Sequence, residues 1–166
     1  MVDIFTEPLT QEAFASYGRV LESPRTAARH YFDDELQSQR SHALPSLSLV
    51  RNEPVHGETL TFDSLECHRY SSQSFVPMSS QRWLVVVAPD VDERPDINGA
   101  RAFVATPDQG ITFFPGTWHL GLHVLDGPAT HAIFMWRDLT ADDETFADVD
   151  PTTLRLPGLS EVQQHE

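Results

Sequence analysis

The sequence contains no lysine, so all 11 basic side chains are arginines. This absence excludes catalysis through a lysine Schiff base, and it excludes a phosphate-binding P-loop, which needs its own lysine. The 25 acidic side chains give the chain a formal net charge of −14. A surface of that sign repels phosphate backbones and anionic lipids, so we expect neither a nucleic-acid partner nor a membrane partner.

Cysteine and long apolar runs are also scarce. Cys67 is the single cysteine of the sequence, so the chain cannot form an internal disulfide. The first residues lack the basic and apolar regions of a secretory leader, and with the lone thiol this predicts a cytoplasmic location. No apolar run approaches the roughly 20 residues that a membrane-spanning helix needs.

What is present is a series of short segments with alternating apolar residues, separated by many of the 12 prolines and 8 glycines. This pattern over residues 46–137 is typical of an all-β barrel or jelly roll. One short N-terminal helix is predicted within residues 9–18, where Thr10 can cap the first turn and Gly18 can end the helix. Residues 23–45 are polar and weakly patterned, which predicts a long loop, and the sequence leaves open whether it acts as a lid.

The length of 166 residues suits one domain with one core. We expect a single domain over residues 1–166, with its core over about 1–138. Residues 139–166 are rich in acids and poor in large apolar residues, so we expect an acidic C-terminal extension there.

Four polar side chains could meet inside such a barrel. Glu66 and His68 are two residues apart, so a strand directs both to one face. Gln73 follows closely, and His119 comes just after the Pro115-Gly116 turn. Oxygen and nitrogen donors of these types can bind a divalent metal. The alternatives are buried histidines with core hydrogen bonds, a solvent-facing Glu66, and a Gln73 that satisfies backbone groups.

Around these residues the sequence resembles the cupin superfamily, and within it the ureidoglycolate lyase family. The resemblance runs over most of residues 10–137 and is carried by TQEAFASYGRVLE, LVRNEP, LECHRYSSQSFVPM and TWH. It implies a cupin-like β-barrel and a homodimer. It also implies a carbon–nitrogen lyase that cleaves (S)-ureidoglycolate to glyoxylate and urea in the allantoin branch of purine catabolism. A divalent metal such as nickel, manganese or zinc is one expected cofactor, and a metal-independent site is the alternative.

The resemblance and the chemistry of that reaction assign a role to each candidate. His68, His119 and Glu66 are the expected catalytic residues, and Arg51, Gln73 and Trp118 the expected substrate-binding residues. Glu66, His68, Gln73 and His119 are the expected metal ligands. The guanidinium of Arg51 matches a substrate carboxylate; a surface salt bridge is its other interpretation, and Arg40, Arg82 and Arg137 are alternative clamps.

The sequence also predicts the orientation of two residues next to the expected site. Strand alternation directs Cys67 away from the face that carries Glu66 and His68, so we do not expect a nucleophile there. His123 lies four residues after His119, so alternation predicts that it shares the face of His119, at the rim of the site.

Some positions depart from the residues common in the family. They are Asp33-Asp34-Glu35 in the long loop, Ser79, and Leu120, and we expect them to cluster around the pocket. They motivate two alternative functions. One is a paralogue that acts on or binds another small hydroxy or keto acid, and the other is a non-catalytic metabolite-binding barrel.

Overall fold

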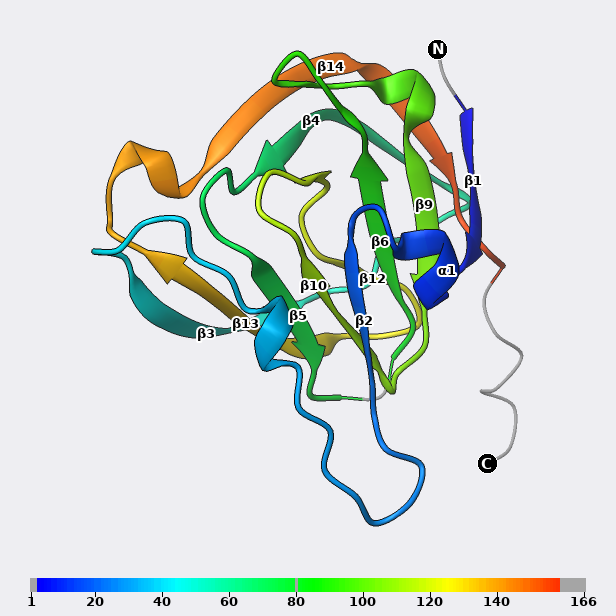
Figure 1. Ribbon diagram of the computed structural model, residues 1–166. Helices are drawn as coiled ribbons and strands as arrows, with labels where there is room; N and C mark the ends of the chain where they lie inside the picture. Colours follow the sequence, from blue (N-terminus) through cyan, green and yellow to red (C-terminus); the bar gives the residue numbers. More distant parts are fainter. Residues whose placement is uncertain (1–2, 80, 159–166) are drawn as a thin grey trace.

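The computed structural model describes residues 3–79 and 81–158, which form mainly β-strands (Figure 1). The strands of the first half are β1 (Asp3–Pro8), β2 (Gly18–Glu22), β3 (Leu44–Asn52), β4 (Thr59–Cys67), β5 (Gln73–Pro77) and β6 (Trp83–Ala88). The strands that follow are β7 (Asp90–Val91), β8 (Arg94–Pro95), β9 (Arg101–Ala105), β10 (Gln109–Phe113), β11 (Trp118–His119), β12 (His123–Val124), β13 (Ala129–Arg137) and β14 (Thr145–Arg155). The helical segments are α1 (Gln11–Phe14) and the 3-10 turns η1 (Asp33–Glu35), η2 (Ile97–Gly99) and η3 (Ala141–Asp143).

The larger sheet has the strand order β11-β4-β14-β1-β9-β6-β12. It closes into a barrel because β11 pairs with β4 on one side and with β6 on the other. β1 runs parallel to both β14 and β9, which makes the barrel mixed. Its interior, called here the barrel core, contains Ile4, Phe62, Leu65, Cys67, Leu84, Val86, Ala88, Ala102, Trp118, Leu125 and Leu154.

The smaller sheet has the order β2-β10-β5-β13-β3 and packs against the outer face of the barrel. The layer between them, called here the inter-sheet core, buries residues from both sheets and from α1. It includes Phe14, Phe75, Trp83, Val85, Val87, Phe103, Ile111, Phe113 and Val124. This two-layer architecture confirms the predicted all-β, cupin-like fold.

The N-terminal helix is shorter than predicted, although its start is where the sequence indicates. The hydroxyl of Thr10 accepts a hydrogen bond from the Ala13 N–H at 3.2 Å, as expected for an N-cap. Phe14 is fully buried and meets the ring of Phe103 edge to face at 5.8 Å. Gly18 already belongs to β2, where a side chain would clash, since a Cβ there would lie 2.0 Å from the Thr112 carbonyl oxygen.

The long loop before β3 is held at its C-terminal end. The Gln39 N–H donates to the Tyr70 carbonyl at 2.8 Å, and the Ser72 N–H donates to the Gln37 carbonyl at 2.9 Å. Residues 37–40 therefore lie beside residues 70–72, directly after His68 in the chain. The loop contains η1, and the strand that follows begins at Leu44.

The sequence gives no indication of β1, and β14 falls in the expected acidic extension, where residues 149–158 are compatible with a final turn or strand. The described part of the expected acidic extension contributes β14, which pairs with β4 and β1, whereas residues 159–166 lie outside the described residues. The register of β14 against β4 shifts between Asp148 and Thr152, opposite Asp63. Near this point the core-facing residues of β4 change from the even-numbered Phe62 to the odd-numbered Leu65 and Cys67.

His131 is a buried titratable group in this fold. It is fully buried on β13, its ring lies 5.0 Å from that of Trp83, and neither ring nitrogen has a hydrogen-bond partner among the described residues. Burial lowers the pKa of His131 to about 4. The folded state therefore resists protonation of this imidazole more than the unfolded chain does.

We predict that His131 makes the folded state less stable in mild acid. Because the unfolded imidazole takes up a proton near pH 6.5 and the folded one only near pH 4, the free energy of unfolding should fall as the pH decreases between these values. His131→Phe should remove this part of the pH dependence. Urea denaturation of both proteins across this range measures the effect, and an unchanged slope in the variant would contradict the assignment.

Candidate metal and acid–base site

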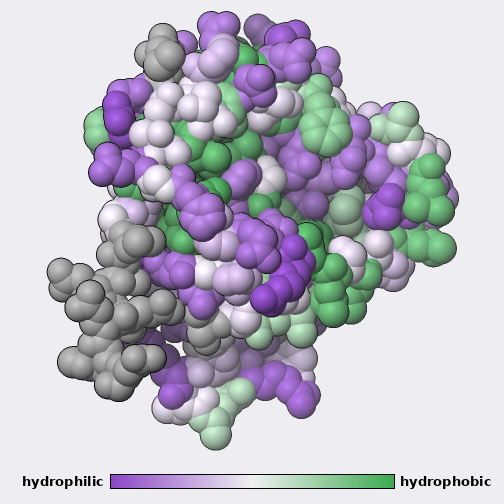
Figure 2. Space-filling model, turned by 180° about the vertical axis from the view of Figure 1, so that it is seen from behind, coloured by the Kyte–Doolittle hydropathy of each residue, from purple (hydrophilic) through white to green (hydrophobic). Residues whose placement is uncertain are grey.

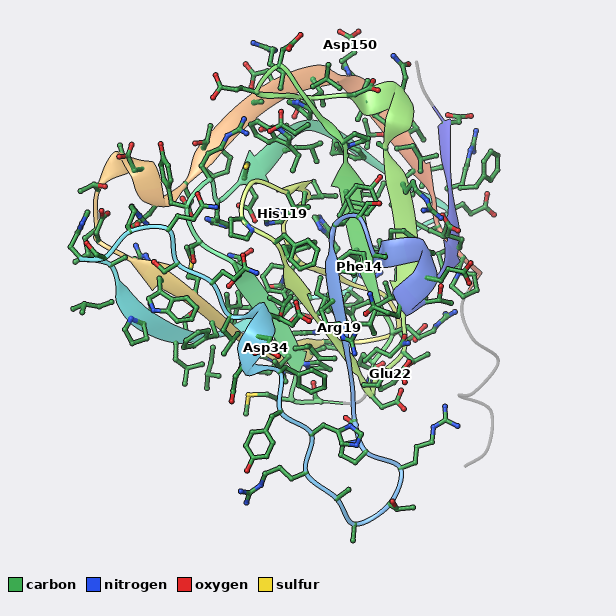
Figure 3. The ribbon with its side chains drawn as sticks, viewed as in Figure 1. Phe14, Arg19, Glu22, Asp34, His119 and Asp150 are labelled. Carbon is green, nitrogen blue, oxygen red and sulfur yellow. The ribbon has the colours of Figure 1, made fainter. Side chains whose placement is uncertain are left out.

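The site forms where the barrel meets the smaller sheet. His119 on β11 is the cross-strand partner of Glu66 on β4, so both side chains point to the same face. That face is directed at β5, which begins with Gln73. The His119 Nε2 lies 3.0 Å from the Gln73 Oε1 and 3.1 Å from the Glu66 Oε1. Figure 3 shows His119 between the strands of the two layers.

His68 joins this group from the end of β4. The donor atoms of Glu66, His68 and His119 all lie within 4.8 Å of one another. The rings of His68 and His119 have their centroids 5.5 Å apart. Glu66, His68, Gln73 and His119, called here the four-residue cluster, are therefore brought together as the sequence predicted.

Both imidazoles are oriented by backbone carbonyls. The Nδ1–H of His68 donates to the Asp143 carbonyl at 2.7 Å, and the Nδ1–H of His119 donates to the Thr117 carbonyl at 2.9 Å. These bonds fix the tautomer and leave Nε2 as the nitrogen that can accept a proton or bind a metal. The Nε2 of His68 is buried and has no hydrogen-bond partner within the described chain.

Aromatic rings close the inner side of the cluster. The His119 ring stacks on Phe113 with centroids 4.1 Å apart and an interplanar angle of 19°. Phe75 meets the same imidazole edge to face at 6.2 Å. Glu66, by contrast, keeps 19% of its side chain exposed, so solvent reaches the cluster from the carboxylate side.

The electrostatics favour a negative Glu66 beside a neutral His68. Burial alone would raise the pKa of the Glu66 carboxyl, but the hydrogen bond from His119 and the charges of the two histidines outweigh it and lower the pKa. Burial lowers the pKa of His68, and the neighbouring charge of His119 adds to this effect. The Glu66 carboxylate and the uncharged His68 therefore coexist at neutral pH.

The oxygens around the His119 Nε2 suit a positively charged group. Its Nδ1–H already donates to a carbonyl, and both atoms facing Nε2 are oxygens that accept hydrogen bonds. A neutral Nε2 would place its lone pair against these oxygens. The contacts become favourable if His119 is an imidazolium or if a cation lies between Nε2 and the oxygens. Two imidazole nitrogens, a carboxylate and an amide oxygen suit a divalent metal, so the residues fit the expected cofactor.

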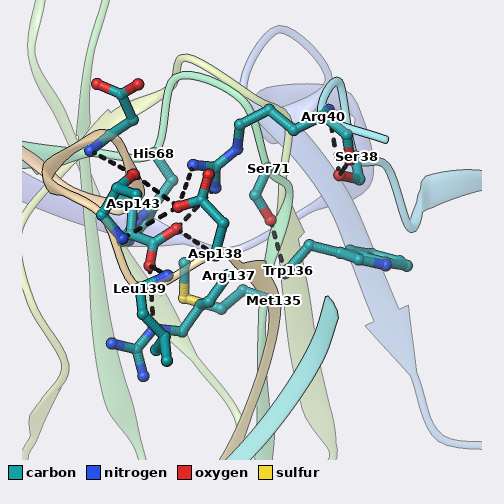
Figure 4. A network of polar contacts seen from close by, with 12 residues as sticks. Ser38, Arg40, His68, Ser71, Met135, Trp136, Arg137, Asp138, Leu139 and Asp143 are labelled. Atoms are coloured by element: carbon teal, nitrogen blue, oxygen red, sulfur yellow. Dashed lines mark hydrogen bonds and ion pairs between the residues drawn. The ribbon is translucent and has the colours of Figure 1, made fainter. Parts of the chain in front are cut away.

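A buried polar network supports His68 from behind (Figure 4). The guanidinium of Arg40 contacts Asp143 at 2.7 Å and Asp138 at 2.9 Å. The Asp143 carboxylate also accepts hydrogen bonds from the backbone N–H groups of Asp138 at 3.0 Å and Leu139 at 2.8 Å. These bonds fix η3, and thereby the carbonyl that orients His68. No sequence pattern predicts this role, because Asp143 acts on His68 through its backbone carbonyl.

Two residues predicted to bind substrate lie outside the four-residue cluster. Arg51 is exposed on β3, whose neighbouring residue Val50 is the cross-strand partner of the buried His131. Alternation therefore places Arg51 on the outer face of the smaller sheet. Trp118 belongs to the barrel core, with the Arg69 guanidinium 5.1 Å from its ring centroid.

The predicted orientation of Cys67 is confirmed, whereas that of His123 is not. Cys67 is fully buried in the barrel core, as alternation predicted, and burial raises its pKa to about 11, so it is a poor nucleophile. The expectation for His123 was wrong. His119 pairs with Val87 of the inter-sheet core, but His123 pairs with Leu84 of the barrel core. The strand is interrupted over residues 120–122, so the alternation does not continue from His119 to His123.

The departures from the family pattern do not surround the cluster. Ser79 lies beyond the far end of β5, where its hydroxyl accepts from the Thr130 N–H at 3.0 Å. Leu120 packs against the barrel core. Asp33–Glu35 form η1, and Asp34 and Glu35 line a cavity with Arg19 that none of the cluster residues lines. The expectation that these changes gather at the site was therefore wrong.

Comparison with known proteins now identifies the lineage. The family model described as ureidoglycolate lyase matches residues 1–155. This chain belongs to the ureidoglycolate lyase family. A ureidoglycolate lyase of Chelativorans sp. (strain BNC1) is 34% identical over 130 residues, covering 72% of this chain and 76% of the relative. A ureidoglycolate lyase of Escherichia coli (strain K12 / DH10B) is 31% identical over 141 residues, covering 80% of each chain.

Membership of the family agrees with the residues gathered at the cluster. The matched range includes Glu66, His68, Gln73 and His119. Within the described parts of the chain, no helix has the length and apolar character needed to cross a bilayer.

We predict that the four-residue cluster binds a divalent cation strongly enough to raise the melting temperature. At a free metal concentration of about 100 times Kd, the stabilisation is about 2.7 kcal/mol, or roughly 5–10 °C for a domain of this size. Nickel, manganese and zinc would be compared by differential scanning fluorimetry. His119→Gln should lose the shift, while His123→Gln, on the opposite face, should keep it. An equal shift in both variants would place metal binding elsewhere.

Proposed function

We propose that this chain is an enzyme that cleaves (S)-ureidoglycolate to glyoxylate and urea in the allantoin branch of purine catabolism. The observation that carries this proposal is the convergence of Glu66, His68, Gln73 and His119 in a member of the ureidoglycolate lyase family. The enzyme is proposed to act as a single cupin-like domain in the cytoplasm, in agreement with the lone buried cysteine.

The reaction needs two proton transfers and no covalent intermediate. One carbon of ureidoglycolate bears a hydroxyl, a carboxylate and a urea nitrogen. As the hydroxyl loses its proton, the carbon–oxygen bond becomes a carbonyl and the carbon–nitrogen bond breaks. The departing nitrogen gains a proton and leaves as urea, so the elimination consumes no water and changes no oxidation state.

Without a metal on the His119 Nε2, the cluster provides a group for each transfer. The Glu66 carboxylate has a lowered pKa and is the most exposed member of the cluster, so it is placed to take the hydroxyl proton. His119 is surrounded by hydrogen-bond acceptors, and a proton on its Nε2 faces the substrate side, where it can be donated to the leaving nitrogen. Positioned acid–base groups typically contribute about 10²- to 10⁴-fold to the rate.

The proposed cofactor is a divalent cation, with nickel, manganese and zinc as candidates. Glu66, His68, Gln73 and His119 would hold it. When bound, such an ion polarises the developing carbonyl oxygen. In the metal-independent alternative, the imidazolium of His119 supplies the positive charge, and the uncharged His68 Nε2 is available as a second proton acceptor.

The direct test is turnover of (S)-ureidoglycolate by the purified protein. We expect glyoxylate and urea to form faster than by spontaneous decay, measured with and without each metal and after treatment with a chelator. Glu66→Gln and His119→Ala should each lower kcat by about 10²- to 10⁴-fold while circular dichroism stays unchanged. His123→Gln is the matched control and should retain activity. No acceleration by the wild-type protein under any metal condition would reject the proposed reaction.

The smaller sheet supports a proposed homodimer. β3 is its edge strand, and its outer face combines with those of β13 and β5. Leu47, Leu49 and Val76 on this face are 70%, 62% and 41% exposed. Figure 2 shows hydrophobic side chains on the side of the molecule where β3 lies. A second copy of the chain that covers this face would bury apolar surface and protect the edge strand.

We predict that Leu49→Glu weakens this association. Sedimentation equilibrium of the wild-type protein should give twice the chain mass of 18.7 kDa, and the variant should shift toward one chain mass. A charge placed in an apolar interface loses its hydration without gaining a partner. Val91→Glu, at a residue that is 53% exposed on β7, is the control and should remain dimeric. A dimeric Leu49→Glu protein would move the interface to another surface.

A further inference from the structure

An anionic substrate needs a cation near the four-residue cluster to hold its carboxylate. The chain carries a net charge of −14, and Glu66 adds a carboxylate to the site itself. The sequence assigned this role to Arg51, but Arg51 lies on the outer face of the smaller sheet. The role therefore requires another residue, and because the chain has no lysine, the permanently charged side chains to consider are the other arginines.

Three other arginines have carboxylate partners already. Arg40 contacts Asp138 and Asp143, and only 9% of its side chain is exposed. Arg69 pairs with Asp90 and lies over the Trp118 ring. The Arg82 guanidinium is bound by Asp126 through two hydrogen bonds of 2.8 and 2.6 Å. None of them offers an unoccupied guanidinium beside the cluster.

Arg137 differs from these residues in position and in its contacts. It lies on β13 two residues after Met135, on the same face. The sulfur of Met135 accepts a hydrogen bond from the Gln73 Nε2 at 3.8 Å, and the two residues are cross-strand partners. Met135 and Arg137 therefore lie on the inner face of β13, separated by about 7 Å of strand, with Met135 in contact with the cluster.

The Arg137 guanidinium is held only by an ion pair that is too long for a hydrogen bond. Its Nε lies 3.6 Å from the Asp143 Oδ2, and the Asp143 carbonyl orients His68, as Figure 4 shows. In the described chain its Nη groups form no hydrogen bond, and 46% of the side chain is exposed. Two free Nη groups in one plane form the fork that binds a carboxylate through two parallel hydrogen bonds.

We propose that Arg137 binds the carboxylate of the anionic substrate at the edge of the four-residue cluster. This proposal rests on the proposed function for the identity of the substrate, but the ligand chemistry is that of any small 2-hydroxy or 2-oxo acid. Asp143 then serves two groups at once, because its carboxylate positions Arg137 and its carbonyl positions His68. The carboxylate-binding group and the cluster are thereby tied to the same turn, η3.

Binding of glyoxylate, measured by isothermal titration calorimetry, tests the proposal without turnover. The wild-type protein should bind glyoxylate and should bind its uncharged methyl ester at least tenfold more weakly. Arg137→Gln should weaken glyoxylate binding by about 10- to 100-fold, the usual range for loss of a charged hydrogen-bonded pair. Arg137→Lys keeps the charge without the fork and should fall between the two.

Matched variants separate this role from general charge effects. Arg155→Gln removes an arginine that is 48% exposed and ion-paired with Asp3, and it should bind glyoxylate like the wild-type protein. Arg51→Gln tests the sequence-based assignment directly. Wild-type affinity in Arg137→Gln, a loss of affinity confined to Arg51→Gln, or equal binding of acid and ester by the wild-type protein would each overturn the proposal.

The same variants distinguish a failure of this proposal from a failure of the proposed function. With ureidoglycolate as substrate, Arg137→Gln should raise KM by about 10- to 100-fold, and Arg155→Gln should not change it. If the wild-type protein binds glyoxylate but does not cleave ureidoglycolate, the reaction is wrong, and the Arg137 comparison by calorimetry still decides the binding role. Absence of glyoxylate binding by the wild-type protein would reject the carboxylate site.

Discussion

The site depends on the shared contact of the His119 Nε2 with two oxygens, Glu66 Oε1 and Gln73 Oε1. These oxygens come from different layers, one from β4 of the barrel and one from β5 of the smaller sheet. The contact therefore exists only while both sheets keep their relative position. Since the Nδ1–H of His119 already donates to a carbonyl, the contact also creates a demand for positive charge. A proton or a metal ion meets that demand.

The position of Glu66 depends in turn on an irregular point in β4. Phe62 and Leu65 both face the barrel core although they are three residues apart, so alternation is broken between them. Regular alternation from Phe62 would direct Glu66 into the barrel core and Cys67 out of it. The break instead puts the thiol inside and aims the carboxylate at His119. A shift of the alternation by one residue in β4 therefore decides whether Glu66 or Cys67 faces the barrel core.

Sequence reasoning succeeded where one uninterrupted element or one tight turn carried the information. The fold class followed from period-two segments, and the Glu66–His68 face followed from alternation within one segment. Predictions of side-chain orientation failed where a strand is interrupted and where the buried face of a strand is not evident from its sequence. The interruption at residues 120–122 invalidated the placement of His123. Alternation alone could not tell the inner face of β3 from its outer face, so the outward position of Arg51 was not predictable.

Other features lay beyond any local pattern. β1 and β14 pair in parallel through residues 3–5 and 153–155, from opposite ends of the described chain, and such a pairing has no signature within either segment. The support that Asp143 gives to His68 runs through a backbone carbonyl, which every residue type possesses. The acid-rich composition of residues 139–166 predicted an acidic extension. Asp143 is instead buried, and its carboxylate accepts hydrogen bonds from Arg40 and from two backbone N–H groups.

The structure also bears on whether the barrel is catalytic or only binds a metabolite. A protein that merely filled this space would lower its energy by giving the His68 Nε2 a partner, because an unpaired buried nitrogen costs about 1–3 kcal/mol. Instead the nitrogen is held by its opposite Nδ1–H in an orientation that keeps Nε2 free. Of the residues that depart from the family pattern, Ser79 and Asp33–Glu35 lie away from the cluster, and Leu120, next to His119, packs its side chain against the barrel core. A buried nitrogen that is oriented but has no hydrogen-bond partner in the described chain favours chemistry on a bound ligand over simple packing.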